Sequence, residues 1–271
     1  MNTASAFKPS TETRAKVIDL STVLKVMDKD SHEETAQEEA KIIKKGVSKC
    51  QYNKVAGVSN EVYPFASEEE IKSMVDVFNK RIDEAPDQDK RWIACRNKML
   101  FLIGINLGIR ASDLCGLKYN FFMNDDRTFK DFYSLQPKKT RKTGKFVKLY
   151  FNTTVKKAIT DYLNDYPMEN IDEYLFKSRE GGHITSIHLG KIIKDTAKDA
   201  GIKKNICSHS LRKTFGYHVW HNAEDKEKAL VMLMSIFNHS SVIMTKKYIG
   251  LMDEEIEDVF NGLNLGLDFS D

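Results

Sequence analysis

Apolar residues recur at helical spacing over most of the chain, and polar or Gly-containing stretches separate the segments that show this spacing. After Ser67, the N-cap of a capping box completed by Glu70, apolar residues follow at positions 71, 74, 75 and 78 on one helix face. Further helices are predicted over 89–107, 153–166, 186–200, 229–237 and 253–263, and another begins at Ser208. Ser186 and Ser208 are the expected N-caps of two of them. The apolar run over 229–237 is expected to form a buried helix.

Two segments carry a different pattern, in which aromatic and β-branched residues alternate or cluster over a few positions. They are Phe129 to Leu135 and Phe146 to Phe151, and Thr140 to Gly144 lies between them as a turn. A hairpin of this kind among many helices predicts a mainly α fold with a small antiparallel β-sheet, of the α+β class.

Residues 1–60 differ from the rest in being polar and in lacking a clear set of core positions. The spacing allows a helix over Arg14 to Met27, an acidic stretch follows from Asp28 to Glu39, and Ala56 to Pro64 has the composition of a linker. We therefore predict an N-terminal accessory segment over 1–60, either reduced or partly disordered, and a second domain over 61–271.

The composition fits a soluble globular protein, with 41% apolar and 30% charged residues in a chain of 271. Its cysteines, Cys50, Cys95, Cys115 and Cys207, are scattered without a Cys-x-x-Cys pair. This predicts reduced thiols in a cytoplasm, with neither a zinc site nor a disulfide framework. The longest apolar run, Met99 to Ile109, is too short to span a bilayer, so we expect no membrane partner and no signal peptide.

The net charge of +3 is distributed unevenly. Residues 253–271 carry seven acidic side chains and no Lys or Arg, so the positive excess lies in the middle of the chain. It is densest at the predicted hairpin tip, where six of the eleven residues from Lys138 to Lys148 are basic and none is acidic. Such a tip is either a solvated turn or a contact with the phosphates of a nucleic acid.

Four side chains in the C-terminal half are spaced so that they could meet at one anion. His209 and Arg212 lie three apart, so on a helix that begins at Ser208 they share one face. His239 comes just after the apolar helix, and Tyr248 follows nine residues later. A guanidinium, imidazoles and a phenol at one phosphate suggest phosphoryl transfer with Tyr248 as the nucleophile.

Arg110 adds a second guanidinium, directly after a Gly that ends a helix expected to be buried. A buried Arg needs a partner, which would be Asp113 in a purely structural role and a substrate anion in a functional one. Taken singly, the other residues have ordinary explanations too, since a Tyr in a helix is usually a packing residue and His-x-x-Arg is usually a capped helix start. The ordered set is what favours a site.

The chain resembles the tyrosine recombinase (phage integrase) family in carrying, in this order, Arg110, a basic hairpin, His209, Arg212, His239 and Tyr248. The resemblance runs from about Tyr63 to Leu265, and its most specific pieces are GIRASDLCGLK, KTGKFVKL, SHSLRKTFG and FNHSSVIMTKKYIG. The sequences of these motifs are similar to those of integrases of conjugative transposons and prophages in Gram-positive bacteria. It implies the DNA breaking-rejoining catalytic fold for residues 61–271.

The resemblance also implies roles. Tyr248 would attack a scissile phosphodiester, leaving a 3′-phosphotyrosine and a free 5′-hydroxyl. Arg110 and Arg212 would hold the non-bridging oxygens, with His239 as a further donor, and His209 would assist the proton that leaves Tyr248. No metal and no cofactor is implied.

The hairpin would supply the remaining groups. Lys142, with Lys139 as the alternative, would protonate the departing 5′-oxygen. The expected DNA contacts are Lys138, Lys139, Arg141 and Lys145. Elsewhere the chain departs from the family pattern twice: Asp113 stands where Glu is usual and should still orient Arg110, and Asn238 precedes His239 where Gly is more common.

The expected partner is double-stranded DNA at recombination sites. By resemblance, a homotetramer would bind it, with the acidic helix over 253–263 docked on a neighbouring protomer, whereas the free protein would be a monomer or a dimer. An accessory DNA-bending or directionality factor is a further possible partner. We expect a bacterial cytoplasmic, nucleoid-associated recombinase that integrates or excises a mobile element.

Other functions stay open at this point. Within the same chemistry, the chain could be a DNA invertase for phase variation or a type IB-like topoisomerase. A non-catalytic DNA-binding regulator is a third alternative, although a pure binder has no need of Tyr248. A metal hydrolase built on His218 and His221 is a fourth, but no third ligand lies at suitable spacing.

Overall fold

A computed structural model describes residues 61–139, 144 and 146–263. The chain divides into two compact units, Met1–Val58 and Ser59–Asp271, and the described residues belong to the second. The expectations for residues 1–60, and those for the hairpin tip at Arg141, Lys142 and Lys145, lie outside the described part.

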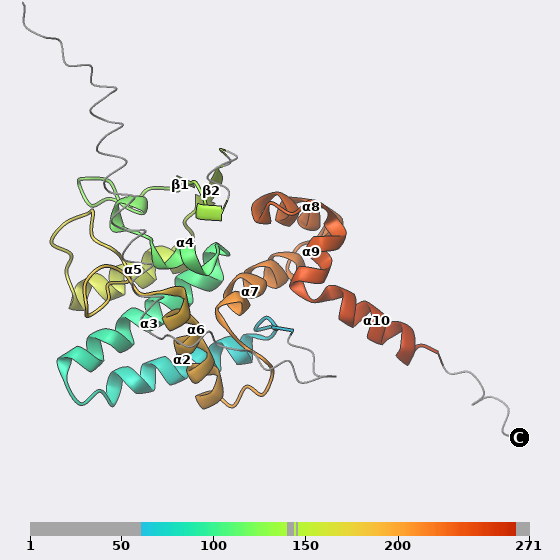
Figure 1. Cartoon of the computed structure of the whole chain (residues 1–271), viewed down its shortest axis with the longest axis horizontal. Coiled ribbons are helices and arrows are strands. Elements are labelled where there is room, and N and C mark those ends of the chain that lie inside the picture. Colours follow the sequence, from blue (N-terminus) through green and yellow to red (C-terminus); the bar gives the residue numbers. More distant parts are fainter. Residues whose placement is uncertain (1–60, 140–143, 145, 264–271) are drawn as a thin grey trace, which may run out of the picture. The chain divides into compact units, whose positions relative to one another are not determined.

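The described part is mainly helical, with a two-stranded antiparallel sheet (Figure 1). This confirms the predicted fold class. In chain order the elements are α2 (Glu68–Asp83), α3 (Gln88–Leu107), α4 (Ala111–Cys115), the 3-10 turn η1 (Tyr119–Phe121), β1 (Phe132–Leu135), β2 (Val147–Tyr150), α5 (Thr153–Asp165), α6 (Ser186–Asp199), α7 (Ser208–His221), α8 (Lys226–Phe237), α9 (Val242–Ile249) and α10 (Leu251–Asn261).

The larger core is built around α3, which packs against α2, α5 and α7. Helix α3 buries residues on most of its circumference, among them Leu100, Phe101 and Ile103. The Phe65 ring meets the Phe101 ring edge to face, with 5.6 Å between the centroids. Each fully buried Leu, Ile or Phe contributes about 1.5–3 kcal/mol to stability, so α3 is held firmly in the core. The segment that follows α3 and contains Arg110 therefore starts from a fixed position.

A smaller core joins α7, α8 and α9 around Leu233, Phe237 and Ile249. Helix α7 belongs to both cores, since Leu211 in its first turn packs in the larger one and Phe215 packs against the smaller one. Helix α7 therefore lies between α3 on one side and α8 and α9 on the other (Figure 1).

The hairpin pairs Phe132 with Tyr150 and Leu135 with Val147. The alternation of strand side chains turns Leu135 and Leu149 into the core and leaves Phe132 and Tyr150 exposed. On the exposed face, the Lys148 ammonium lies 3.9 Å from the centroid of the Phe132 ring.

Local helix-start signals were right in kind and sometimes wrong by one residue. Ser67 caps α2 as predicted, accepting a hydrogen bond from the Glu70 N–H. The N-cap of α6, however, is Thr185 and not Ser186, because the Thr185 hydroxyl accepts from the N–H three residues on. Likewise the N-cap of α7 is Cys207 and not Ser208.

The segment 229–237 is helical as predicted, but the helix is not fully buried, so this part of the prediction was wrong. The helix begins earlier, at Lys226, and Val231 and Met232 are 53% and 55% exposed. Only one face of α8 is covered, by α7 and α9, so half of its apolar residues remain outside the core. No single helix of the described ranges is long and apolar enough to cross a membrane, whereas α8 and α9 pass that test as a pair bent by 90°.

Two glycines inside helices, Gly190 and Gly216, allow a test of how closely α9 packs against α7. A Cβ at Gly216 would lie 2.6 Å from Ile249 Cγ2 and 2.9 Å from the Phe237 ring, whereas a Cβ at Gly190 would meet nothing closer than 3.9 Å. Ala gains about 0.5–1 kcal/mol over Gly inside a helix, but overpacking costs about 1–3 kcal/mol. We expect Gly190→Ala to raise the Tm in thermal unfolding and Gly216→Ala to lower it. A higher Tm in both variants would contradict the close approach of α7 and α9.

Candidate active site

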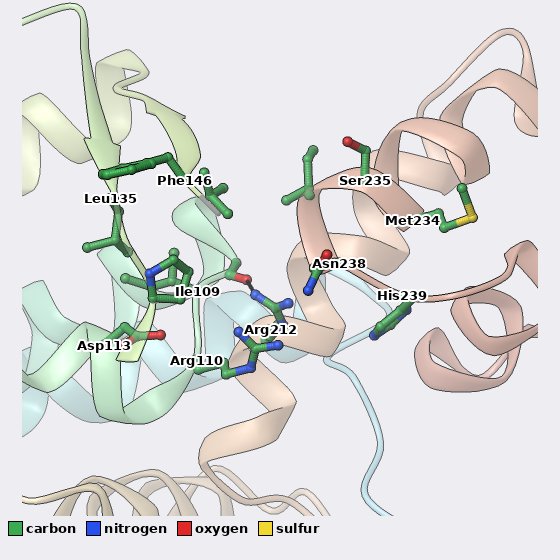
Figure 2. A pocket seen from close by; sticks show the side chains of 14 residues that line it. Ile109, Arg110, Asp113, Leu135, Phe146, Arg212, Met234, Ser235, Asn238 and His239 are labelled. Atoms are coloured by element: carbon green, nitrogen blue, oxygen red, sulfur yellow. Dashed lines mark hydrogen bonds between the residues drawn. The ribbon is translucent and has the colours of Figure 1, made fainter. Parts of the chain in front are cut away.

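Arg110 reaches the site because α3 ends abruptly before it. Gly108 adopts a left-handed conformation with φ of 58°, and a Cβ there would lie 2.2 Å from the Phe215 ring. Gly is therefore required on two counts, backbone conformation and space. The chain then turns so that Arg110 precedes α4, and Figure 2 shows its side chain beside that of Arg212.

Asp113 does not pair with Arg110 in an ion pair, as the purely structural explanation required. The buried Asp113 carboxylate instead accepts a hydrogen bond from the Lys138 N–H at 2.9 Å, which ties α4 to the chain just after β1. Within the described ranges the Arg110 guanidinium has neither a hydrogen bond nor an ion pair. It lines the pocket together with Asp113 and Arg212.

Arg212 is fixed by the backbone at both sides of the site. Only 7% of this residue is exposed, and its guanidinium donates to the carbonyls of Gly108 and Phe237. The guanidinium carbon also lies 4.2 Å from the centroid of the Phe237 ring. Burial lowers the pKa of Arg212 to about 10, and the charge of Arg110 acts in the same direction. Arg212 therefore remains charged at neutral pH and is held rigidly.

Two neighbouring guanidiniums repel each other, and the repulsion is relieved when an anion lies between them. The pocket that holds them has a volume of about 360 Å³. It is lined by Arg110 and Arg212 at its base, by hairpin residues such as Pro137 and Phe146, and by the C-terminal end of α8 with His239 (Figure 2). Such a pocket suits one phosphate group.

His239 is placed by the end of α8. Asn238 adopts a left-handed conformation with φ of 53° and ψ of 48°, which Asn tolerates better than most residues other than Gly. Asn238, which stands where the family more often has Gly, therefore still forms a left-handed C-cap at the end of α8. The Nδ1 atom of His239 lies 3.1 Å from the Thr245 hydroxyl, while Nε2 has no hydrogen-bond partner within the described ranges. Burial first, and then Arg212 and Arg110, lower the pKa of His239.

Tyr248 lies against this group of residues. Its ring meets the rings of Phe237 and His239 edge to face, with centroid distances of 5.4 and 5.1 Å. Burial raises the pKa of Tyr248, whereas the charges of Arg212 and Arg110 and a polar contact with Arg212 lower it. The phenol therefore lies close enough to both guanidiniums for their charges to act on its pKa.

His209 stands apart from the pocket lining. It lies in the first turn of α7, and its side chain is exposed. Although exposed, it has a lowered pKa, first from partial desolvation and then from the charges of Arg212 and Lys213. The structure therefore brings Arg110, Arg212, His239 and Tyr248 together and leaves His209 at the edge of the group.

The described hairpin residues Lys138 and Lys139 are exposed just after β1, beside the pocket wall formed by Pro137. The metal alternative finds no support in the contacts of its residues. The His218 ring nitrogen Nε2 lies 2.9 Å from the Phe65 carbonyl, and the His221 ring stacks on Tyr217. The described residues contain no group of three or more His, Cys, Asp or Glu side chains that could hold a metal ion.

Sequence patterns missed three residues that touch the site: Phe237, Thr245 and Lys213. Phe237 packs on Arg212 and Tyr248, the buried Thr245 holds the His239 ring, and the Lys213 ammonium lies 5.7 Å from the centroid of the Tyr248 ring. The only local signal was a Thr three residues before Tyr248 on one helix face, which is too common to single out.

Acidification is expected to destabilise the free protein. Burial is the main cause of the lowered pKa values of His188, His209 and His239 in the folded chain. In the unfolded chain these rings take up protons near their ordinary pKa of about 6.5. Below about pH 6.5 the unfolded state therefore binds more protons, and the free energy of unfolding decreases as the pH falls toward the folded pKa values.

The measurement is the Tm between about pH 7 and about pH 5, where we expect a decrease that His239→Gln makes shallower. A Tm that is constant over this range would show that these rings are not held neutral by the fold. An equally steep decrease in wild type and His239→Gln would show the same for His239 alone.

Three comparisons with known proteins bear on this site. The pattern of the family described as the Phage integrase family matches residues 65–255. The chain is 35% identical over 181 residues to a probable integrase/recombinase, YoeC, of Bacillus subtilis, covering 64% of this chain and 91% of that protein. It is 24% identical over 196 residues to tyrosine recombinase XerC of Halalkalibacterium halodurans, covering 72% of this chain and 60% of that protein.

Solved structures show the same fold. The XerA recombinase superposes with a TM-score of 0.53 at 21% identity, covering 76% of this chain and 66% of that one. The XerH site-specific recombinase, in a pre-cleavage complex with its difH substrate, superposes with a TM-score of 0.52 at 18% identity, covering 75% and 56% of the two chains.

Proposed function

The chain belongs to the phage integrase family, and on this premise we propose that it is a site-specific recombinase that cleaves and rejoins DNA through a covalent bond to Tyr248. The observation that carries the proposal is the packing of the Tyr248 ring on His239 and on Phe237, the ring that also carries Arg212. This places Tyr248 next to the pocket lined by Arg110, Arg212 and His239. Arginines are well shaped to hold a phosphodiester, because each guanidinium can donate two parallel hydrogen bonds to phosphate oxygens.

In the proposed cleavage step the Tyr248 oxygen attacks phosphorus and the bond from phosphorus to the 5′-oxygen breaks. The phenolic proton leaves toward His209, whose lowered pKa keeps its ring neutral and able to accept it. The departing 5′-oxygen takes a proton from Lys142, with Lys139 as the alternative donor. The products are a 3′-phosphotyrosine and a free 5′-hydroxyl, so atoms and charge balance without hydrolysis.

Charge develops on the non-bridging oxygens in this step, and Arg110, Arg212 and the Nε2 atom of His239 would stabilise it. Preorganised cations act strongly in a site from which water is largely excluded. The energy of the broken phosphodiester stays in the phosphotyrosine bond, so the reverse attack by a 5′-hydroxyl can reseal either the same or an exchanged strand.

Burial gives Tyr248 a raised pKa in the free protein, which would keep the phenol protonated until DNA arrives. The test is incubation with a nicked suicide duplex, followed by denaturing electrophoresis. In this duplex the short fragment that carries the new 5′-hydroxyl diffuses away after cleavage, so the strand cannot be resealed. We expect a covalent adduct of protein and DNA. A non-catalytic regulator would bind the same duplex and form none.

The proposed partner is double-stranded DNA at recombination sites. The exposed Lys138 and Lys139 stand beside the pocket and would contact phosphates flanking the scissile one, together with Arg141 and Lys145 of the hairpin tip. Integration or excision of a mobile element is the use we propose, on the similarity to a probable integrase/recombinase of Bacillus subtilis.

Assembly into a tetramer is proposed from α10. Ile256, Val259 and Phe260 of this acidic helix, and Leu263 just after it, are all exposed, which is costly for a monomer. Docking this face on a neighbouring protomer would cover it, and a head-to-tail contact of this kind closes into a ring. It also favours a recombinase over a relaxing topoisomerase, which needs no second protomer.

Deleting residues 253–271 is therefore expected to weaken synapsis of two sites more than binding to one site. Gel-shift titration with a single-site duplex and native electrophoresis of the paired complex measure the two effects. Equal losses in both would indicate that the segment supports the fold or DNA binding and not the assembly.

A further inference from the structure

Lys213 is a buried cation beside the proposed nucleophile to which no role has been given above. It follows Arg212 on α7, and only 7% of the residue is exposed. Its ammonium lies 3.3 Å from a carboxylate oxygen of Glu61 and 5.7 Å from the centroid of the Tyr248 ring. An ammonium is strongly hydrated, so a buried position is costly unless its contacts are used.

The partner of Lys213 comes from a segment that is firmly attached to α7. We call Glu61–Ala66 the strap. Its Tyr63 N–H donates to the carbonyl of Asn205, and its Phe65 N–H donates to the Thr214 hydroxyl at 2.9 Å. The Phe65 side chain is fully buried. These contacts hold the strap in place, so Glu61 has a fixed position next to Lys213.

The Tyr248 ring is surrounded on its other sides. Phe237 and His239 meet it edge to face at interplanar angles of 71° and 70°, and Arg212 contacts its hydroxyl end. A cation within about 6 Å of an aromatic centroid is attracted to the ring. Because Arg212 and Lys213 are consecutive on one helix, α7 presents a guanidinium to the hydroxyl and an ammonium to the ring.

We propose that Lys213 is a positioning residue of the cleavage reaction: held by Glu61 of the strap, its ammonium fixes the Tyr248 ring so that the hydroxyl stays against Arg212. The inference rests on the proposed function of Tyr248. Tyr248 lies in the last turn of the short helix α9, and its ring is in contact with Phe237, His239 and Lys213. A displacement of about 1 Å at a reacting group can cost about a hundredfold in rate.

The test is the single-turnover rate of adduct formation at saturating suicide duplex, with the Kd for the same duplex measured in parallel. We expect Lys213→Met to cleave about tenfold more slowly with Kd changed less than about twofold, since the ring loses its cation but the DNA contacts remain. Lys213→Arg keeps a cation and should recover to within about threefold of wild type. The Tm of Lys213→Met should fall, because the change leaves the partly buried Glu61 carboxylate without its ion pair. The rates are therefore compared at a temperature at which both proteins are folded.

The matched control is Lys204→Met. Lys204 pairs with Glu70 at 2.7 Å, is partly buried, and joins the first turn of α2 to the chain before α7 without touching Tyr248. We expect its cleavage rate to equal that of wild type. A second variant, Glu61→Gln, keeps Lys213 and removes the carboxylate that pairs with it, and it should also slow cleavage. The double variant Glu61→Gln/Lys213→Met should cleave no more slowly than Lys213→Met, because both changes remove the same contact.

The outcomes separate the two proposals. Absence of an adduct from the wild-type protein would overturn the proposed function. A wild-type adduct with an equal rate in Lys213→Met, a loss confined to Kd, or a loss that Lys213→Arg does not recover would overturn the role of Lys213 alone. A tenfold loss shared by Lys204→Met would assign the effect to general weakening of the strap region.

Discussion

Tyr248→Phe is expected to abolish the covalent adduct with a nicked suicide duplex, lowering its rate of formation by a factor of at least about 10³. The change removes one oxygen and leaves the ring, which keeps its edge-to-face contacts with Phe237 and His239. The fold should therefore persist, with a change in the free energy of unfolding of about 1 kcal/mol or less. Kd for the duplex should be nearly unchanged, because Arg110 and Arg212, the proposed phosphate contacts, still line the pocket.

The matched control is Tyr150→Phe, which removes a hydroxyl from an exposed position on the hairpin. It should form adduct at the wild-type rate. An adduct that persists in Tyr248→Phe would move the nucleophile to another side chain, and the proposed mechanism would fail even if the family assignment stood.

Arg212→Lys is expected to have the second largest effect, a loss of about 10²- to 10³-fold in the rate of adduct formation. A lysine keeps the positive charge but cannot donate to the Gly108 and Phe237 carbonyls and to a phosphate at the same time. The positive charge would remain in the site, but the orientation of the group that carries it would no longer be fixed. We expect the free energy of unfolding to fall by about 1–3 kcal/mol as well, because one buried carbonyl loses its donor.

Arg96→Lys separates the catalytic loss from the loss of stability. Arg96 is as deeply buried as Arg212, at 2% exposure, and burial likewise lowers its pKa to about 10. Its guanidinium donates to the Lys177 carbonyl and to the Asn97 side chain, away from the pocket. A comparable decrease in Tm with an unchanged adduct rate is expected. If both variants lost activity to the same extent, the effect of Arg212→Lys would reflect folding and not phosphate binding.

The element boundaries that the sequence predicted well are those set by local chemistry. The helix predicted over 89–107 is observed over Gln88–Leu107, because Asp87 caps its first turn and Gly108 takes the left-handed conformation that ends it. The hairpin strands were also found, although shorter than predicted. The errors at Ser186 and Ser208 arose because two adjacent residues could both act as caps, and only the backbone conformation decides which one does.

Burial was less accessible to sequence patterns. The apolar run of α8 was expected to be buried, but its cover consists of α7 and α9 alone, so Val231 and Met232 face outward. The same uncertainty applied to Asp113, whose nearest positive residue in the sequence was Arg110. The folded chain gives it a backbone N–H of Lys138 in place of that partner.

The ordered residues of the motif, the helical periodicity and the positions of the stop glycines determined, without coordinates, that this chain is a mainly helical member of its family with Arg110, Arg212, His239 and Tyr248 as candidates. These features are local, since each depends on neighbours within one or two turns. The contacts among those residues were decided only by the tertiary structure. Arg212 binds the carbonyl of a residue 104 positions away, and Lys213 meets Glu61 across 152 positions. Such pairings depend on how α3, α7, α9 and the strap pack, and with them the burial that shifts each pKa in the site.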